Sequence, residues 1–367
     1  NAKRIKKPVV LHVVTQKGKG YELAESNPSR YHGVSPLTRA GDKVEKKPSI
    51  SFTEAFAGSL VKHATEDSRI VGVTAAMADG TGMSYFKEHF PNRFYDVGIA
   101  EQHAVTFSAG MAISGLRPVT AIYSTFMQRA VDQVIHDVAL PGLPVVFAMD
   151  RSGLVGGDGE THQGLYDIPL YRSVPGLTFL APADESEVEM MLKWGLEQDS
   201  PVMLRYPKSA CPENNSLLTA PIEPGRGTMV HDANSDILLI SVGGLFHEAQ
   251  EAVRLSAERG IGVDHYNLRF IKPINEEFLT DVISHYSKVY MVEDGAALGG
   301  IGEYVAGILL KNNVKVQFRW AGVSDTYLPQ ATRGQLLEAC KLDRHSISEA
   351  LQKQMSDSFS IVKPAVS

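Results

Sequence analysis

The chain has 367 residues, of which 43% are hydrophobic and 21% charged, an ordinary composition for a soluble α/β protein of about two domains. Its net charge of −6 provides no general attraction to nucleic acid or to an anionic membrane, and no apolar run reaches transmembrane length. The two cysteines, Cys211 and Cys340, lack the spacing of a disulfide framework or a zinc site, so we expect a reducing compartment, the cytoplasm.

The first 48 residues combine an apolar stretch with a polar one. The sequence "PVVLHVVTQKGKGY", residues 8–21, predicts a buried strand followed by a loop, and such a strand needs neighbours on both sides. No preceding sequence is present to supply them, so we expect the chain to be the back part of a longer protein. The stretch from Glu22 to Pro48 has no hydrophobic period, which is typical of a linker.

Residues 49–211 show the pattern of a parallel sheet covered by helices. The segment "SFTEAFAGSLVKHATED" begins with a capping box, Ser51 followed by Glu54, and continues with helical periodicity. Near-continuous apolar strands follow in "RIVGVTAAM", "RPVTAIYS", "LPVVFAMD" and "SPVMLRYPKSA", and the helical segment "FMQRAVDQVIHDVAL" lies among them. Strands of this kind, alternating with helices, indicate a sheet that is buried on both faces.

A second α/β unit is expected over residues 225–351. Residues 212–227 are rich in Pro, Asn and Gly, as in an interdomain linker. Strands are then predicted in "SDILLISVGG", "GVDHYNLRF", "KVYMVED" and "VKVQFRW", and helices at residues 245–259, at 275–285 and in "IGEYVAGILLK". The predicted fold class is therefore α/β, with two consecutive domains.

Glu101 is the first candidate for a functional residue. It follows the predicted strand "FYDVG" and opens a long apolar helix. A carboxylate in the first turn of a helix also favours the helix dipole, which is a purely structural explanation. However, its neighbours are apolar on both sides, and a buried carboxylate needs a partner that shares a proton. The carboxyl ends of parallel strands are also where ligands bind in such sheets.

Four long motifs resemble those of a known family. They are "YDVGIAEQHAVTFSAGMA", "AIYSTFMQRAVDQVIHDVAL", "AMDRSGLVGGDGETHQG" and "LRYP". In this order they resemble the transketolase-type thiamine diphosphate enzymes, and among them the 1-deoxy-D-xylulose-5-phosphate synthases, over nearly the whole chain. The resemblance implies the end of a diphosphate-binding domain plus linker at 1–48, a pyrimidine-binding domain at 49–211 and a transketolase C-terminal domain at 225–351.

The resemblance also implies roles for residues that contact the cofactor. Glu101 would face N1′ of the aminopyrimidine and help to generate the reactive ylide. Tyr21 matches a tyrosine that contacts the cofactor, and Phe126 matches an aromatic residue that stacks on the pyrimidine. His32 and His162 match histidines of the active site. Without the resemblance, Tyr21 and Phe126 would be a loop aromatic and a core residue, and a lone histidine is usually structural or solvated.

Other residues match the pocket for the phosphorylated acceptor aldehyde. The implied set is Tyr123, Arg151, Asp158 and Arg205. A guanidinium binds phosphate bidentately, although each arginine alone would be interpreted as a surface ion-pair residue. Asp158 could meet His162 through the turn between them, and we also expect Arg129 to pair with Asp158.

Two departures from the family pattern limit which functional residues can be assigned by resemblance. The family's metal motif is a GDG followed about 30 residues later by paired asparagines. Here no such pair follows residues 157–159 at that spacing, so no metal ligands are predicted in this chain and Mg²⁺ ligands are expected in a missing N-terminal part. Lys208 and Ser209 stand where many relatives have Arg and Gly, which affects the acceptor pocket.

The function implied is the condensation of pyruvate with D-glyceraldehyde 3-phosphate, with loss of carbon dioxide, to 1-deoxy-D-xylulose 5-phosphate. This is the first step of the methylerythritol phosphate route to isoprenoids, and its product also serves thiamine biosynthesis. Thiamine diphosphate and Mg²⁺ are the implied cofactors and a homodimer the implied assembly, with neither nucleic acid nor membrane as a partner. Two alternatives are the beta subunit of a 2-oxo-acid dehydrogenase and a non-catalytic fragment.

Overall fold

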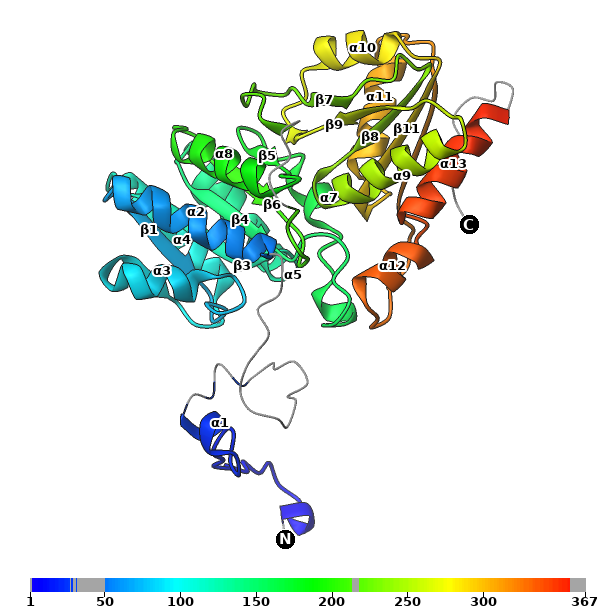
Figure 1. Cartoon of the computed structure of the whole chain (residues 1–367). Helices are drawn as coiled ribbons and strands as arrows, with labels where there is room; N and C mark the ends of the chain where they lie inside the picture. The colour runs from blue at the N-terminus through cyan, green and yellow to red at the C-terminus, as the bar shows by residue number, and fades with distance from the viewer. Residues whose placement is uncertain (1, 27, 29–30, 32–49, 213–217, 357–367) are drawn as a thin grey trace. The chain divides into compact units, whose positions relative to one another are not determined.

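The computed structural model describes residues 2–26, 28, 31, 50–212 and 218–356. For residues 354–356 it describes the backbone alone. It divides the chain into two compact units, Asn1–Lys47 and Pro48–Ser367, each described here by itself. Figure 1 traces the elements of both units along the chain.

The described part of the first unit contains two short helices, η1 (Ala2–Arg4) and α1 (Glu22–Ser26). The backbone N–H of Gly20 donates to Glu25 at 2.8 Å and holds the turn before α1. Residues 8–14 form no strand, and Val10 is 95% exposed. The buried strand predicted there is wrong, because a strand requires a hydrogen-bonded neighbour and the described residues of this unit supply none.

The second unit begins with a seven-stranded sheet in the order β10-β5-β6-β4-β3-β1-β2. All neighbours are parallel except β10, which pairs antiparallel with β5. The strands are β1 (Ile70–Thr74), β2 (Phe94–Asp96), β3 (Arg117–Tyr123), β4 (Val146–Asp150), β5 (Thr178–Leu180), β6 (Val202–Arg205) and β10 (Phe270–Lys272). The strands predicted for β1, β3, β4 and β6 are confirmed.

Helices cover both faces of this sheet, as the continuous apolar strands predict. One face packs on α2 (Phe52–Glu66), α3 (Met83–His89) and α8 (Glu185–Leu196), with the 3₁₀ turn η2 (Pro91–Arg93) after α3. The capping box of Ser51 and Glu54 is present at the start of α2. The other face packs on α4 (Glu101–Ile113), the π-helix η4 (Val134–Ala139) and α7 (Asp167–Tyr171).

The helical segment between β3 and β4 is less regular than predicted. It consists of α5 (Ser124–Met127), η3 (Gln128–Ala130), α6 (Val131–Gln133) and η4. The backbone of Ala130 leaves the helical region at φ −111° and ψ 18°, so the chain turns there. Arg129 directly precedes this turn, and Phe126 lies in α5, earlier in the same segment.

The second sheet has five strands in the order β12-β11-β8-β9-β7, with β7 alone antiparallel to its neighbour. The strands are β7 (Thr228–His231), β8 (Ile237–Ser241), β9 (Asp264–Asn267), β11 (Lys288–Ala296) and β12 (Gln317–Val323). Its helical elements are η7 (Gly243–Leu245), α9 (Phe246–Glu258), α10 (Glu276–Ser284), α11 (Ile301–Lys311), α12 (Arg333–Ala339) and α13 (Arg344–Ser356). The predicted strand "GVDHYNLRF" splits at Arg269, whose φ is +61°, into β9 and β10.

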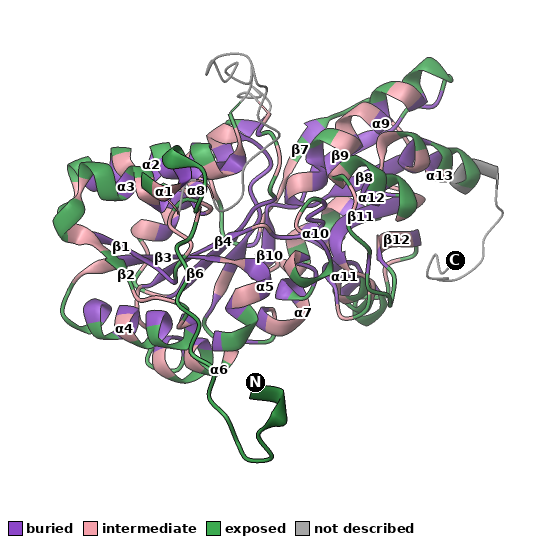
Figure 2. Cartoon of the chain, turned by 90° about the horizontal axis from the view of Figure 1, so that it is seen from below, coloured by how far each residue is buried: buried purple, intermediate pink, exposed green. Residues whose placement is uncertain are grey.

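One buried hydrophobic cluster contains residues of both sheets. Ile168 and Tyr171 of α7 belong to the same buried cluster as Ile301 and Val305 of α11. Figure 2 shows the buried residues concentrated on the strands of both sheets. Among the described residues, no helix is both long and apolar enough to cross a membrane.

Candidate functional site

The candidate site lies at the carboxyl ends of β3 and β4. The last residues of these strands, Tyr123 and Asp150, are partners in the parallel register. The helix α5, which carries Phe126, directly follows β3, and Arg151 directly follows β4. Arg151 has a φ of +60°, a strained conformation for a residue other than glycine and one that occurs often at functional sites.

Glu101 begins α4 and is buried, with 2% of its surface exposed. Its Oε1 accepts a hydrogen bond from Nη1 of Arg129, whose side chain is 47% exposed. The guanidinium of Arg129 also lies over the ring of Phe126, with 4.8 Å between Cζ and the ring centroid. The predicted pair of Arg129 with Asp158 is therefore wrong, because Arg129 points instead to the buried carboxylate of Glu101.

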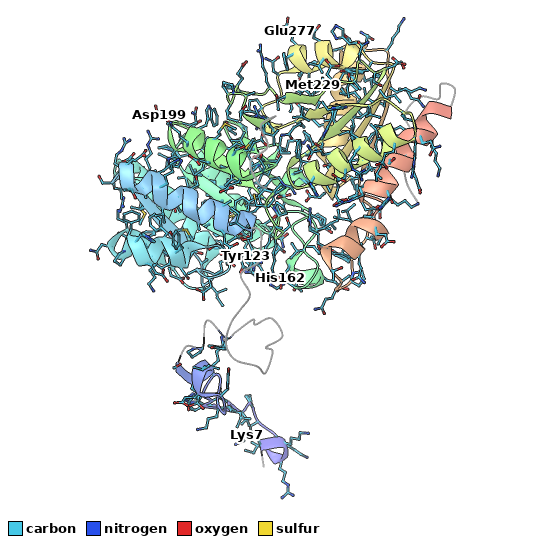
Figure 3. All side chains as sticks on the ribbon, viewed as in Figure 1. Lys7, Tyr123, His162, Asp199, Met229 and Glu277 are labelled. Atoms are coloured by element: carbon cyan, nitrogen blue, oxygen red, sulfur yellow. The ribbon has the colours of Figure 1, made fainter. Side chains whose placement is uncertain are left out.

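Two further rings, those of Tyr123 and His162, lie beside Phe126. The rings of Tyr123 and Phe126 stack with centroids 5.7 Å apart, and His162 meets Phe126 edge-on at 5.2 Å. Figure 3 labels Tyr123 and His162, whose side chains lie next to each other. His162 comes from the 3₁₀ turn η5 (Glu160–His162), so the structure brings together three residues that the sequence singled out.

Arg151 links the aromatic rings to Asp158. Its guanidinium lies over the ring of Tyr123, with Cζ 3.7 Å from the centroid, and its Nη1 donates to the carbonyl oxygen of Gly80 at 2.6 Å. Its Nε is 3.4 Å from Oδ2 of Asp158, which also accepts from Nζ of Lys208 at 2.7 Å. Two cations of the site therefore converge on one carboxylate.

Burial and charge set the protonation of these groups. Burial raises the pKa of Tyr123 to about 12 and lowers the pKa of His162, so both are neutral at pH 7. Burial also raises the pKa of Asp150 to about 6, against the effects of Arg151 and of the hydroxyl of Thr53. Burial alone would raise the pKa of Asp158, but Lys208 and Arg151 outweigh it and hold that pKa below its usual range.

Arg205 differs from the other predicted substrate-binding residues. Its side chain is 2% exposed, and it donates from Nε to Asp167 at 2.8 Å and from Nη1 to Asp294 at 2.9 Å. Both carboxylates are buried as well. The remaining nitrogen of Arg205, Nη2, is buried and has no hydrogen-bond partner among the described residues, so a phosphate contact of Arg205 through Nη2 stays a prediction.

Two further predicted residues, Tyr21 and His32, come from the first 48 residues of the chain. Tyr21 belongs to the first unit, where its ring meets Tyr31 edge-on at 5.6 Å. His32 lies outside the described residues. Within the part of the chain that the structure describes, no group of three His, Cys, Asp or Glu side chains could hold a metal ion.

Three parts of the site were not among the predicted site residues. Asp150 lies within the motif "AMDRSGLVGGDGETHQG" but was not singled out there, and the backbone of Gly80 cannot be recognised from residue type. The hydroxyl of Tyr123 approaches Gly80 so closely that a Cβ there would lie 1.5 Å from it. Lys208 was noticed only as a departure from the family pattern, and its position after a predicted strand end was the signal available.

Comparison with known proteins assigns both domains to one family. Residues 48–213 match the family model "Transketolase, pyrimidine binding domain", and residues 225–347 match "Transketolase, C-terminal domain". The chain belongs to the transketolase family. Glu101, Phe126, Arg151, Asp158 and His162 all lie within the first of these domains.

Curated relatives within the family are named 1-deoxy-D-xylulose-5-phosphate synthase. That of Treponema pallidum (strain Nichols) is 46% identical over 349 residues, which is 95% of this chain and 55% of the relative. That of Halothermothrix orenii is 43% identical over 362 residues, or 97% of this chain and 56% of the relative. The chain thus spans a little over half the length of these transketolase-type relatives.

Solved structures agree on the transketolase fold. The protein described as "Split gene transketolase, inactive beta4 tetramer" has a TM-score of 0.76 and 28% identity, covering 84% of this chain and 99% of its own. The transketolase of Campylobacter jejuni has a TM-score of 0.72 at 14% identity, covering 85% of this chain and 48% of its own. The second likeness supports the fold alone.

Proposed function

We propose that this chain is the part of a 1-deoxy-D-xylulose-5-phosphate synthase that binds the cofactor's pyrimidine and the acceptor substrate. The proposal is carried by 46% identity to a synthase of that name over 95% of the chain. The complete enzyme would condense pyruvate with D-glyceraldehyde 3-phosphate and release carbon dioxide. Its product would enter the methylerythritol phosphate route to isoprenoids and the synthesis of thiamine.

The described residues fit the aminopyrimidine part of thiamine diphosphate. Glu101 offers a buried carboxylate and Phe126 a partly buried aromatic face, and both lie around the guanidinium of Arg129. Because Arg129 is half exposed, it can move and leave Glu101 free to share a proton at N1′ of the ring. When bound, the cofactor would supply the carbanion that adds to pyruvate and carries the two-carbon unit to the aldehyde.

The acceptor side of the proposed site is cationic. Arg151 and Lys208 both donate to Asp158 in this structure, and the phosphate of the aldehyde would compete with Asp158 for these donors. His162, neutral at pH 7, could accept a proton from a substrate hydroxyl, while Tyr123 holds Arg151 in place through its ring. Mg²⁺ and the diphosphate would be held by residues other than those described here.

We also infer a homodimer. Apolar side chains are exposed at Ile99, just before α4, at Ile113, its last residue, and at Leu140, just after η4. A second copy that packed on α4 and η4 would bury them. We also propose a cytoplasmic location, since Cys211 and Cys340 lack the spacing of a disulfide framework.

Product analysis tests the proposal directly. The complete purified protein, with thiamine diphosphate and Mg²⁺, is expected to form deoxyxylulose phosphate from pyruvate and the triose phosphate. Acetylation of a lipoyl acceptor without that product would instead support the beta subunit of a 2-oxo-acid dehydrogenase. If neither product forms while cofactor binds, the proposed substrates are wrong.

One observation favours a second possibility, a subunit that is inactive without a separate chain. The protein named as a split-gene transketolase is covered over 99% of its length by this chain, so a polypeptide of this extent exists on its own elsewhere. The mass of the polypeptide in its native cells separates the two. A single chain well above 40.0 kDa supports the synthase, whereas a chain of about this mass that copurifies with a second polypeptide supports the subunit interpretation.

A further inference from the structure

The loop of residues 151–164 carries three groups of the site, Arg151, Asp158 and His162. At its base the loop closes on itself, because Gly153 and Gly164 exchange backbone hydrogen bonds of 2.7 and 2.9 Å. The tip, which bears Asp158, lies beyond this closure and needs support from elsewhere in the protein.

The C-terminal domain supplies backbone contacts to the tip. The N–H of Ala331 donates to the carbonyl oxygen of Gly156 at 3.3 Å, and Nε2 of Gln330 donates to that of Gly157 at 2.8 Å. A Cβ on Gly156 would lie 2.2 Å from the carbonyl oxygen of Ala331, so the two backbones touch. The loop therefore rests on the segment immediately before α12.

Arg333, the first residue of α12, ties this segment to the loop. Its Nη1 donates to the carbonyl oxygen of Leu154 at 2.7 Å, and its Nη2 donates to Oδ2 of Asp294 at 3.1 Å. Asp294 is 1% exposed and also accepts from Arg205 at 2.9 Å. A Cβ on Gly153 would lie 2.2 Å from the carboxylate of Asp294, so this carboxylate supports the loop as well.

We propose that Arg333 is a positioning residue that holds the loop of residues 151–164 in the geometry needed for acceptor binding. The role in acceptor binding rests on the proposed function, whereas the role in holding the loop rests on the contacts alone. One guanidinium joins a loop carbonyl to a buried carboxylate, so the position of the loop is fixed by the C-terminal domain.

The electrostatics of Asp294 support this arrangement. Burial alone would raise the pKa of Asp294, but Arg205 and Arg333 outweigh burial and hold it below its usual range. Asp294 is therefore ionised at neutral pH, and its hydrogen bond with Arg333 is charge-assisted on both sides. Such bonds are stronger and more directional than neutral ones, which suits a residue that fixes a loop.

The test compares Arg333→Gln, Arg333→Lys and a matched control, Arg344→Gln, in the complete protein. Arg344 also begins a helix of the C-terminal domain and pairs with Glu248 at 2.8 Å, but it makes none of the loop contacts described above. We expect amide hydrogen exchange in residues 153–164 to rise about tenfold in Arg333→Gln and to stay unchanged in the control. Arg333→Lys is expected to restore part of the protection.

Steady-state kinetics distinguish a role in acceptor binding from a purely structural role, because only the former changes KM for one substrate selectively. In Arg333→Gln, KM for the triose phosphate is expected to rise about tenfold while KM for pyruvate changes less than about twofold. Unchanged exchange in the loop, or an equal effect on both substrates, would overturn the inference. If the wild-type protein forms no deoxyxylulose phosphate, the proposed function fails, and the exchange comparison still decides whether Arg333 holds the loop.

Discussion

Replacing Arg205 by methionine tests whether this arginine is structural or binds substrate. In the structure Arg205 lies between two buried carboxylates, those of Asp167 and Asp294, at 2.8 and 2.9 Å. Methionine fills a similar volume but leaves both carboxylates without this partner. Removing one member of a buried ion pair costs about 3–5 kcal/mol, because the remaining charge stays buried.

The loss is measurable by urea unfolding at pH 7. With an m value of about 3 kcal/mol/M, the expected cost lowers the midpoint by roughly 1–2 M. The pH dependence gives a second check. In the wild type the stabilisation at Asp294 is present above its ordinary pKa and is lost as the pH falls through its lowered pKa.

In Arg205→Met, Asp294 keeps its ion pair with Arg333 but loses that with Arg205, so it takes up a proton more readily than in the wild type. The stability deficit of the variant is therefore largest near pH 7 and shrinks as the pH falls. Arg205→Lys, which can keep one ion pair, should lie between the two proteins. A midpoint equal to that of the wild type, together with a raised KM for the triose phosphate, would refute the structural interpretation.

Three further predictions follow from single contacts. Glu101→Ala should abolish product formation and leave the unfolding midpoint within about 0.5 M, since the residue is proposed to act on the cofactor. The pKa of Asp150 is about 6 in the folded protein and lower in the unfolded chain, so the wild type should lose about 3 kcal/mol of unfolding free energy as the pH rises from about 4 to 6. Asp150→Asn should remove this loss. Gly153→Ala should cost about 2 kcal/mol or more in urea unfolding, because φ is +73° and the new Cβ would meet the carboxylate of Asp294.

Each of these has an outcome that contradicts it. Full turnover in Glu101→Ala would remove the basis of the proposed mechanism, and Glu101→Asp, which loses reach, should be impaired as well. Parallel stability–pH curves for the wild type and Asp150→Asn would show that Asp150 does not titrate in this range. Gly157→Ala is the control for Gly153→Ala, since a Cβ on Gly157 meets nothing within 4 Å, and equal costs at both positions would contradict the contact with Asp294.

The alternation of helices and strands in the second unit could be predicted from the sequence because it depends on local signals. The capping box at Ser51 and the apolar runs of β3 and β4 determine hydrogen bonding and burial over a few residues. The strand β10 could not be assigned to its sheet in this way. Its partner β5, Thr178–Leu180, lies far back in the sequence, and the local pattern of residues 270–272 does not identify that partner.

The strand predicted for residues 8–14 failed for a related reason. Its apolar pattern is real, but a strand also depends on a neighbour, and residue type does not reveal whether one is available. In the site, the motif positions of Glu101, Phe126 and His162 could be identified, yet the partner of Arg129 could not. Which carboxylate an arginine reaches depends on helix geometry, here the break at Ala130, rather than on spacing in the sequence.

The strand β10 has a consequence for how the molecule holds together. It lies in the sequence of the C-terminal domain but completes the sheet of the other domain by pairing with β5. A polypeptide ending near residue 212 would expose the backbone groups of β5 as an open edge, prone to pairing with other chains. The two domains are therefore interlocked, and neither is expected to survive intact when it is cut away from the other.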